Sequence, residues 1–167
     1  ARLARAAEAH LVGAAPTGIS RFVPPDVLAA GLDQMAARCR TLRKEAYAAL
    51  DRFALLAQEE GVLSYEARLV EDDPDGGLPL AARYCNLAVA GQPDRTVVDP
   101  MLPADLPQQL ALYGGHPVLV LPATSGVPDL SGDALVAWDG SAAATRAVAG
   151  ALPLLARARR VRILGLG

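Results

Sequence analysis

The sequence predicts an α/β protein, with an open parallel sheet covered by helices on both faces in a Rossmann-like arrangement. Short apolar runs alternate with amphipathic segments along the chain, and alternating strands and helices form parallel sheets. Residues 117–122 of the run 116–122 are continuously apolar, which is typical of strands buried on both faces. Glycine, proline and aspartate gather between the runs and mark the turns.

Composition and charge exclude several classes of function. Of the 167 residues, 52% are hydrophobic and 20% are charged, as in a globular protein. A net charge of −2 gives no electrostatic reason to expect a nucleic-acid or membrane partner. An aromatic content of 4% argues against a stacking platform for single strands. Cys39 and Cys85 follow no metal spacing and predict reduced thiols in a cytoplasmic protein.

The first part of the chain predicts a helix end, a strand and a long helix. Residues 1–9 have the pattern of a helix end, and the apolar run 10–15 predicts a strand closed by a Pro-Thr-Gly turn. A loop is expected over 20–31. Apolar residues then recur at intervals of three and four and predict one face of a helix that ends at Gly61: Leu32, Met35, Cys39, Leu42, Ala46, Ala49, Phe53 and Leu56. The basic residues mostly lie off this stripe and predict a solvated face.

The middle of the chain predicts further alternating elements. A strand is expected over 63–70, followed by an acidic turn over 71–77 that lacks the spacing of a calcium loop. The remaining elements are a short helix at 78–84, a strand at 86–90 that ends at Gly91, a proline-rich loop at 92–107, a helix at 106–113 and a buried strand at 116–122.

The pattern restarts after a polar linker. Residues 133–139 predict a buried strand, and the Asp-Gly-Ser sequence that follows it predicts a turn into a helix over 141–159. Pro153 should kink or divide this helix, and a last strand is expected over 161–166. In open α/β sheets, such a strand-to-helix junction is where ligands dock.

Four passages of the sequence resemble the universal stress protein family, whose fold is Rossmann-like, of the adenine nucleotide alpha hydrolase-like type. Asp139-Gly140-Ser141 is similar to the family's first strand-to-helix turn, and 151–155 with 161–164 is similar to its first helix and second strand. The segment 82–91 resembles the helix, strand and glycine that precede the nucleotide loop, and 115–122 resembles the last strand. Their order and spacing carry the resemblance, which covers most of the chain.

The resemblance implies a tandem member of the family, incomplete at both ends. Residues 1–122 are similar to a first domain that lacks its initial strand, 123–132 is the linker, and 133–167 is similar to the first β-α-β unit of a second domain. Two explanations fit this order. The strand at 133–139 takes the place of the missing strand, or the chain is a fragment of a larger tandem protein, which is the preferred explanation.

The resemblance also implies a nucleotide site, but its loop departs from the family pattern G-x-x-G-(x)9-G-[S/T]. Glycines in that loop let backbone N–H groups close around phosphates. Gly91 fits the first position, whereas Asp94 holds the next glycine position and Ala104-Asp105 holds the last pair. Each aspartate would repel a triphosphate by roughly 4 kcal/mol at ~4 Å and an effective dielectric of ~20. The loop is therefore expected to be degenerate, which argues against ATP as a cofactor there.

The best match to the implied site is the turn formed by Asp139, Gly140 and Ser141. In nucleotide-binding relatives, the acidic residue at this turn meets the adenosine portion. A helix-capping Asp-Gly turn explains the same residues equally well, so both interpretations stay open. Trp138 and His116 are expected to be structural and His10 to lie at the surface, and no Ser/His/Asp order or Cys/His pairing predicts a catalytic or metal site.

The first functional hypothesis is a stress-response regulatory or ligand-binding protein of the universal stress type, without strong catalytic activity. Its ligand would be a small molecule or a nucleotide. It would self-associate, because the apolar strand 116–122 is expected at a sheet edge. The second hypothesis is a weak ATP-binding hydrolase that uses the Asp139 turn. The third is a dimerisation or interaction module whose site is a relic.

Overall fold

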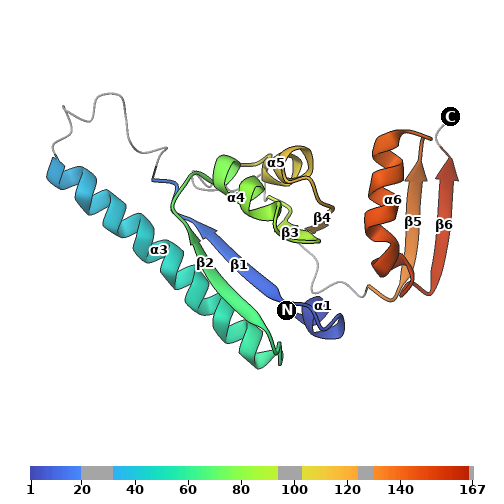
Figure 1. The fold of residues 1–167 in the computed structure, drawn as a ribbon, viewed down its shortest axis with the longest axis horizontal. Coiled ribbons are helices and arrows are strands. Elements are labelled where there is room, and N and C mark those ends of the chain that lie inside the picture. The colour runs from blue at the N-terminus through green and yellow to red at the C-terminus, as the bar shows by residue number, and fades with distance from the viewer. Residues whose placement is uncertain (20–31, 94–102, 124–129, 166–167) are drawn as a thin grey trace. The chain divides into compact units, whose positions relative to one another are not determined.

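Helices alternate with short parallel strands along most of the chain (Figure 1). A computed structural model describes residues 1–19, 32–93, 103–123 and 130–165. In these ranges the strands form three two-stranded parallel sheets, so the predicted mixed α/β class is confirmed. One continuous sheet with helices on both faces stays a prediction. The expected loop over 20–31 lies outside the described residues, as do 94–102 of the proline-rich loop and 124–129 of the linker.

The described residues divide into two compact units. The first contains the described part of 1–81 together with Pro103, and the second contains the other described residues from Ala82 onwards. The strand pairs respect this division, because β1 pairs with β2 in the first unit, whereas β3 pairs with β4 and β5 with β6 in the second. The domain boundaries expected from the resemblance stay a prediction.

The first unit is built around a long helix packed on a strand pair. Helix α1 (Arg2–Ala6) precedes β1 (Leu11–Pro16), and α3 (Leu32–Glu59) leads to β2 (Tyr65–Val70). The two strands are parallel, with Leu11 beside Tyr65 and Pro16 beside Val70. Two small apolar clusters join the helix to the strands: Ala4, Ala57 and Val62 in one, and Ala15, Ala46 and Leu50 in the other.

The predicted end of α3 at Gly61 is confirmed and has a clear physical cause. Gly61 has a φ of +69°, a conformation that favours glycine. Its N–H donates to the carbonyl of Gln58 at 2.9 Å, and the N–H of Val62 donates to the carbonyl of Ala57 at 2.9 Å. This is the Schellman arrangement, and the packing of Val62 against Ala57 supplies the apolar contact that usually accompanies it.

The predicted apolar stripe of α3 is correct in its middle and wrong at its end. Leu42 and Ala46 are buried, but Leu56 is 56% exposed, and Ala57 is buried in its place. The reason is the helical repeat of 3.6 residues, which places Ala57, four residues after Phe53, on the buried face. The basic residues of the helix are exposed, as predicted.

The acidic stretch after β2 is partly helical, which corrects the predicted turn over 71–77. Helix α4 (Pro74–Ala82) begins four residues earlier than the helix predicted at 78–84. Proline is favoured in the first turn because its missing N–H would have no helical partner there. The N–H of Gly77 then donates to the carbonyl of Asp73 at 2.8 Å and closes the first turn.

The second unit contains two strand pairs. Strand β3 (Ala88–Gly91) pairs in parallel with β4 (Val118–Leu121), and α5 (Leu106–Tyr113) packs against both. Strand β5 (Asp133–Trp138) pairs in parallel with β6 (Arg160–Gly165), and α6 (Ala142–Leu155) packs against β5. Helix α6 continues through Pro153 and ends two residues later, well before the predicted residue 159.

Strands form within 116–122 and 133–139 of the second unit, but the prediction that these strands are buried is wrong. The residues of β4 are half-buried or exposed, and β5 alternates exposed and half-buried residues. Leu135 is 68% exposed, whereas Trp138 is half-buried. The physical reason is that α6 covers one face of β5, so side chains that point the other way stay accessible.

Candidate functional site

The strand-to-helix turn at 139–141 has the predicted local structure. Strand β5 ends at Trp138, and α6 begins after Ser141. The carboxylate of Asp139 accepts a hydrogen bond from the Ser141 N–H at 2.9 Å. Gly140 has a φ of +73°, which glycine adopts without strain. The Ser141 hydroxyl oxygen accepts from the Ala144 N–H at 3.0 Å and caps the helix.

The hydrogen bonds of the turn favour the ionised form of Asp139. Two hydrogen bonds from Ser141 hold the pKa of Asp139 below its ordinary value. The bond from the Ser141 side chain has the larger effect, and the bond from its backbone N–H has the smaller one. The carboxylate also lies at the N-terminus of α6, where the helix dipole favours negative charge. Asp139 and Gly140 are exposed. The turn can therefore accept hydrogen bonds from the hydroxyl or amino groups of a ligand.

The other predicted site residue, Gly91, has no structural need to be glycine. It ends β3, its φ is not in the left-handed region, and a Cβ placed on it would meet no atom within 4 Å. Asp139, Gly140 and Ser141 lie together in one turn, whereas Gly91 belongs to a different strand pair.

The residues at the expected loop positions 94 and 105 are aspartates, which do not suit a phosphate group. Asp94 lies outside the described residues. Asp105 occupies the N-cap position of α5, and its carboxylate accepts a hydrogen bond from Gln109 Nε2 at 3.0 Å. A carboxylate thus stands where the glycine-loop pattern calls for a hydroxyl, and it would repel a phosphate.

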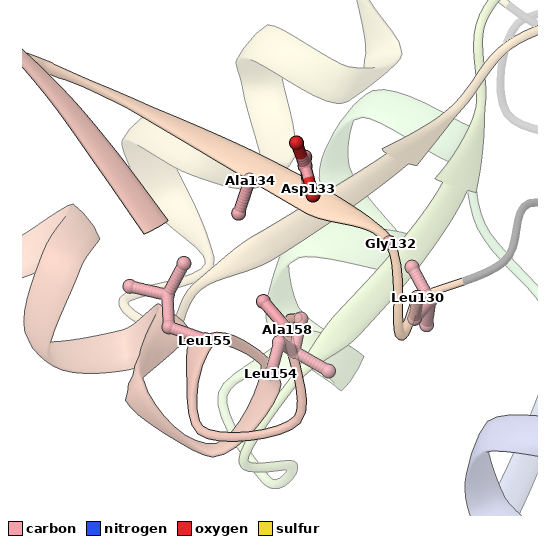
Figure 2. A pocket seen from close by; sticks show the side chains of 7 residues that line it. All are labelled: Leu130, Gly132, Asp133, Ala134, Leu154, Leu155 and Ala158. Atoms are coloured by element: carbon pink, nitrogen blue, oxygen red, sulfur yellow. The ribbon is translucent and has the colours of Figure 1, made fainter. Parts of the chain in front are cut away.

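A small pocket lies at the opposite end of α6 from the turn (Figure 2). Its volume is about 150 Å³, which is below the ~300 Å³ of a small ligand site. The lining is mostly apolar and comes from the start of β5 and the end of α6: Leu130, Gly132, Asp133, Ala134, Leu154, Leu155 and Ala158. In Figure 2 the Asp133 carboxylate points away from the leucines, and it pairs with Arg159 at 2.9 Å. This pocket is a small gap between packed side chains, and none of the predicted site residues lines it.

The sequence reasoning missed a polar cluster in the first unit. His10 is exposed, as predicted, but its Nδ1 lies 2.7 Å from the Ser64 hydroxyl, and its Nε2 lies 3.7 Å from a carboxylate oxygen of Glu66. More than 50 residues separate His10 from both partners. The signal that could have found the cluster is the strand register, because parallel pairing that sets Leu11 beside Tyr65 also sets His10 beside Ser64.

Neither a metal centre nor a membrane span is found in the described part of the chain. No group of three or more His, Cys, Asp or Glu residues among these residues could hold a metal ion. None of the helices described has the length and apolar character of a membrane span. In comparisons with known proteins, no family model matches the chain and no curated protein shows significant similarity to it.

Proposed function

We propose that this chain is a ligand-binding regulatory module of the universal stress type, whose Asp139 turn receives the nucleoside end of an adenine nucleotide. The observation that carries the proposal is the ionised carboxylate held at the end of β5 and the N-terminus of α6. Ligands of open α/β proteins bind at such junctions. Gly140 leaves the turn open, since a Cβ there would meet nothing within 4 Å.

The chemistry of the turn favours a nucleoside over a phosphate. The Asp139 carboxylate can accept hydrogen bonds from ribose hydroxyl groups, whereas a phosphate oxygen offers no proton near neutral pH and would be repelled. We therefore expect adenosine and ATP to bind this chain with similar affinity.

Self-association in the cytoplasm is part of the same proposal. Strand β4 pairs with β3 and with no other strand in the described ranges, so one of its edges is unpaired within these ranges. Val120 on this strand is 43% exposed and Val89 on β3 is 53% exposed. An apolar edge of this kind is a template for pairing with a second chain. Light scattering over a range of concentrations tests this part, and a monomer at every concentration would refute it.

Calorimetric titration with adenosine, ADP, ATP and cyclic AMP tests the ligand. Asp139→Asn keeps an oxygen that can accept from the Ser141 N–H but removes the charge, and Asp139→Ala removes both. A hydrogen bond to a charged group contributes roughly 1.5–3 kcal/mol, so Asp139→Ala should weaken binding by about 10- to 100-fold. Asp51→Asn, the same substitution at an exposed aspartate of α3, is the matched control and should bind normally.

Other results of the calorimetric titration would indicate other functions. Absence of binding to all four ligands would refute the proposal, and with a stable dimer it would support an interaction module. Phosphate release from ATP that Asp139→Ala abolishes would instead support the hydrolase. Equal affinity of wild type and Asp139→Ala would show that a ligand binds elsewhere.

A further inference from the structure

The parallel register of β1 and β2 brings three chemically complementary side chains to one end of the first unit. The N–H of Leu11 donates to the carbonyl of Ser64 at 2.9 Å, which fixes the backbone of Ser64 beside His10. Val12 pairs with Glu66 in the strand register. Because side chains alternate along a strand, Ser64 and Glu66 share the side of the sheet on which His10 lies.

This side of the sheet is accessible. A Cβ on Gly13 would lie 2.5 Å from the Phe53 ring of α3, so the residues in phase with Gly13 face that helix. His10 and Ser64 are out of phase with it, and the His10 and Glu66 side chains are 49% and 43% exposed. A reagent can therefore approach the Ser64 hydroxyl from solvent.

The distances suit a serine activated by an imidazole. His10 Nδ1 lies 2.7 Å from Ser64 Oγ, within the range of a hydrogen bond. Glu66 Oε2 lies 3.7 Å from Nε2, and its negative charge favours the tautomer with the proton on Nε2. Nδ1 is then free to accept the proton of Ser64. Arg68 pairs with the other oxygen of Glu66 and restrains that carboxylate.

We propose that Ser64 is a nucleophile activated by His10 and that it accepts acyl groups from small activated esters. Glu66 acts as a positioning residue through His10. This activity is separate from the ligand site at Asp139, which lies in the other unit. A nucleophile next to a base that a third group orients is the arrangement that covalent catalysis requires.

The reaction is balanced with the groups present. A bond forms between Ser64 Oγ and the carbonyl carbon of the ester, while the bond from that carbon to the leaving oxygen breaks. The hydroxyl proton passes to His10 Nδ1 and then to the leaving oxygen. Water later attacks the acyl carbon, gives a proton to His10, and Ser64 recovers its hydroxyl proton as the acid leaves.

Labelling of the whole chain with a fluorophosphonate, followed by peptide mass spectrometry, tests the proposal. Such a reagent forms an Oγ–phosphorus bond and releases fluoride, so the product stays on the serine. We expect labelling at Ser64, and the His10→Gln rate should be about 100-fold lower, at the low end of general-base effects. His116→Gln is the matched control, because the chain has two histidines, and it should be labelled at the wild-type rate.

Glu66→Gln separates positioning from folding. It removes the charge next to Nε2 but keeps His10 and Ser64, so its labelling rate should lie between those of wild type and His10→Gln. Circular dichroism checks that each variant keeps its fold. Absence of label on Ser64 in the folded wild type would overturn the proposal, as would equal rates for His10→Gln and His116→Gln. Hydrolysis of p-nitrophenyl acetate that Ser64→Ala abolishes would extend it to turnover.

Discussion

Gly13 offers the sharpest test of how the long helix packs on the first strand pair. A Cβ at this position would lie 2.5 Å from Cδ1 and 2.6 Å from Cγ of Phe53. The first distance is about 1 Å shorter than the ~3.5 Å at which carbon atoms make favourable contact. The Phe53 ring packs edge-on against Tyr65, with a centroid separation of 6.2 Å, which limits its movement. Gly13→Ala should therefore force α3 away from β1.

The expected loss of stability in Gly13→Ala is the usual cost of overpacking a protein interior. Extra methyl groups in a packed interior cost about 1–3 kcal/mol, which corresponds to a roughly 5- to 150-fold increase in the opening of α3. Hydrogen exchange of the α3 amides measures this opening in the first unit alone. Phe53→Ala removes the ring, so Gly13→Ala should cost little or nothing in that background. Gly91→Ala is the control, because its Cβ would meet no atom within 4 Å.

Two results would refute this reasoning about the packing. The first is a Gly13→Ala variant that exchanges its α3 amides no faster than wild type. The second is an equal cost of Gly13→Ala with and without the Phe53 ring, because the clash would then have another partner. Faster exchange of the β3 amides in Gly91→Ala would also count against this reasoning. It would show that an added Cβ can destabilise the protein even where the glycine is surrounded by open space.

Three further predictions concern the helix cap, the core and pH. Ser141→Ala removes the hydroxyl that caps α6, and it should destabilise the helix by about 1 kcal/mol, measured by hydrogen exchange of α6 amides. Leu42 is 1% exposed and Leu56 is 56% exposed, so Leu42→Ala should cost about 2–5 kcal/mol and Leu56→Ala less than about 0.5 kcal/mol, measured by urea unfolding. The folded-state pKa of Asp139 is lowered, so its stabilisation is present above about pH 4 and is lost as pH falls through the lowered pKa. Thermal unfolding of wild type and Asp139→Asn across this range should show the difference disappear in acid.

Local signals predicted the elements of this fold well. Helix α5 has the bounds expected from the glycines that follow it, and Gly61 ends α3 as its position in the pattern indicated. These features depend on the few residues around them, which the sequence displays directly. The bounds of α6 were less accurate, because several small and apolar residues beyond Leu155 suit a helix equally well.

Features that depend on distant residues were harder to predict. The buried residue near the end of α3 is Ala57 and not Leu56, because the helix turns by 3.6 residues and the register of its contacts with β1 decides between neighbours. The cluster of His10, Ser64 and Glu66 depends on pairing between strands over 50 residues apart, which no local pattern reveals. The Asp139 turn was predicted because its hydrogen bonds lie within the seven residues 139–145.

The most direct test of the proposed function is an amide NMR titration of the chain with adenosine. We expect the Gly140 and Ser141 amide signals to shift with a saturable dependence on adenosine, and we expect Asp139→Ala to abolish these shifts. ATP should produce the same shifts at similar concentrations, because the turn contacts the nucleoside end. Unchanged Gly140 and Ser141 signals at saturating adenosine, or equal shifts in Asp139→Ala, would contradict the assignment of this turn as a ligand site.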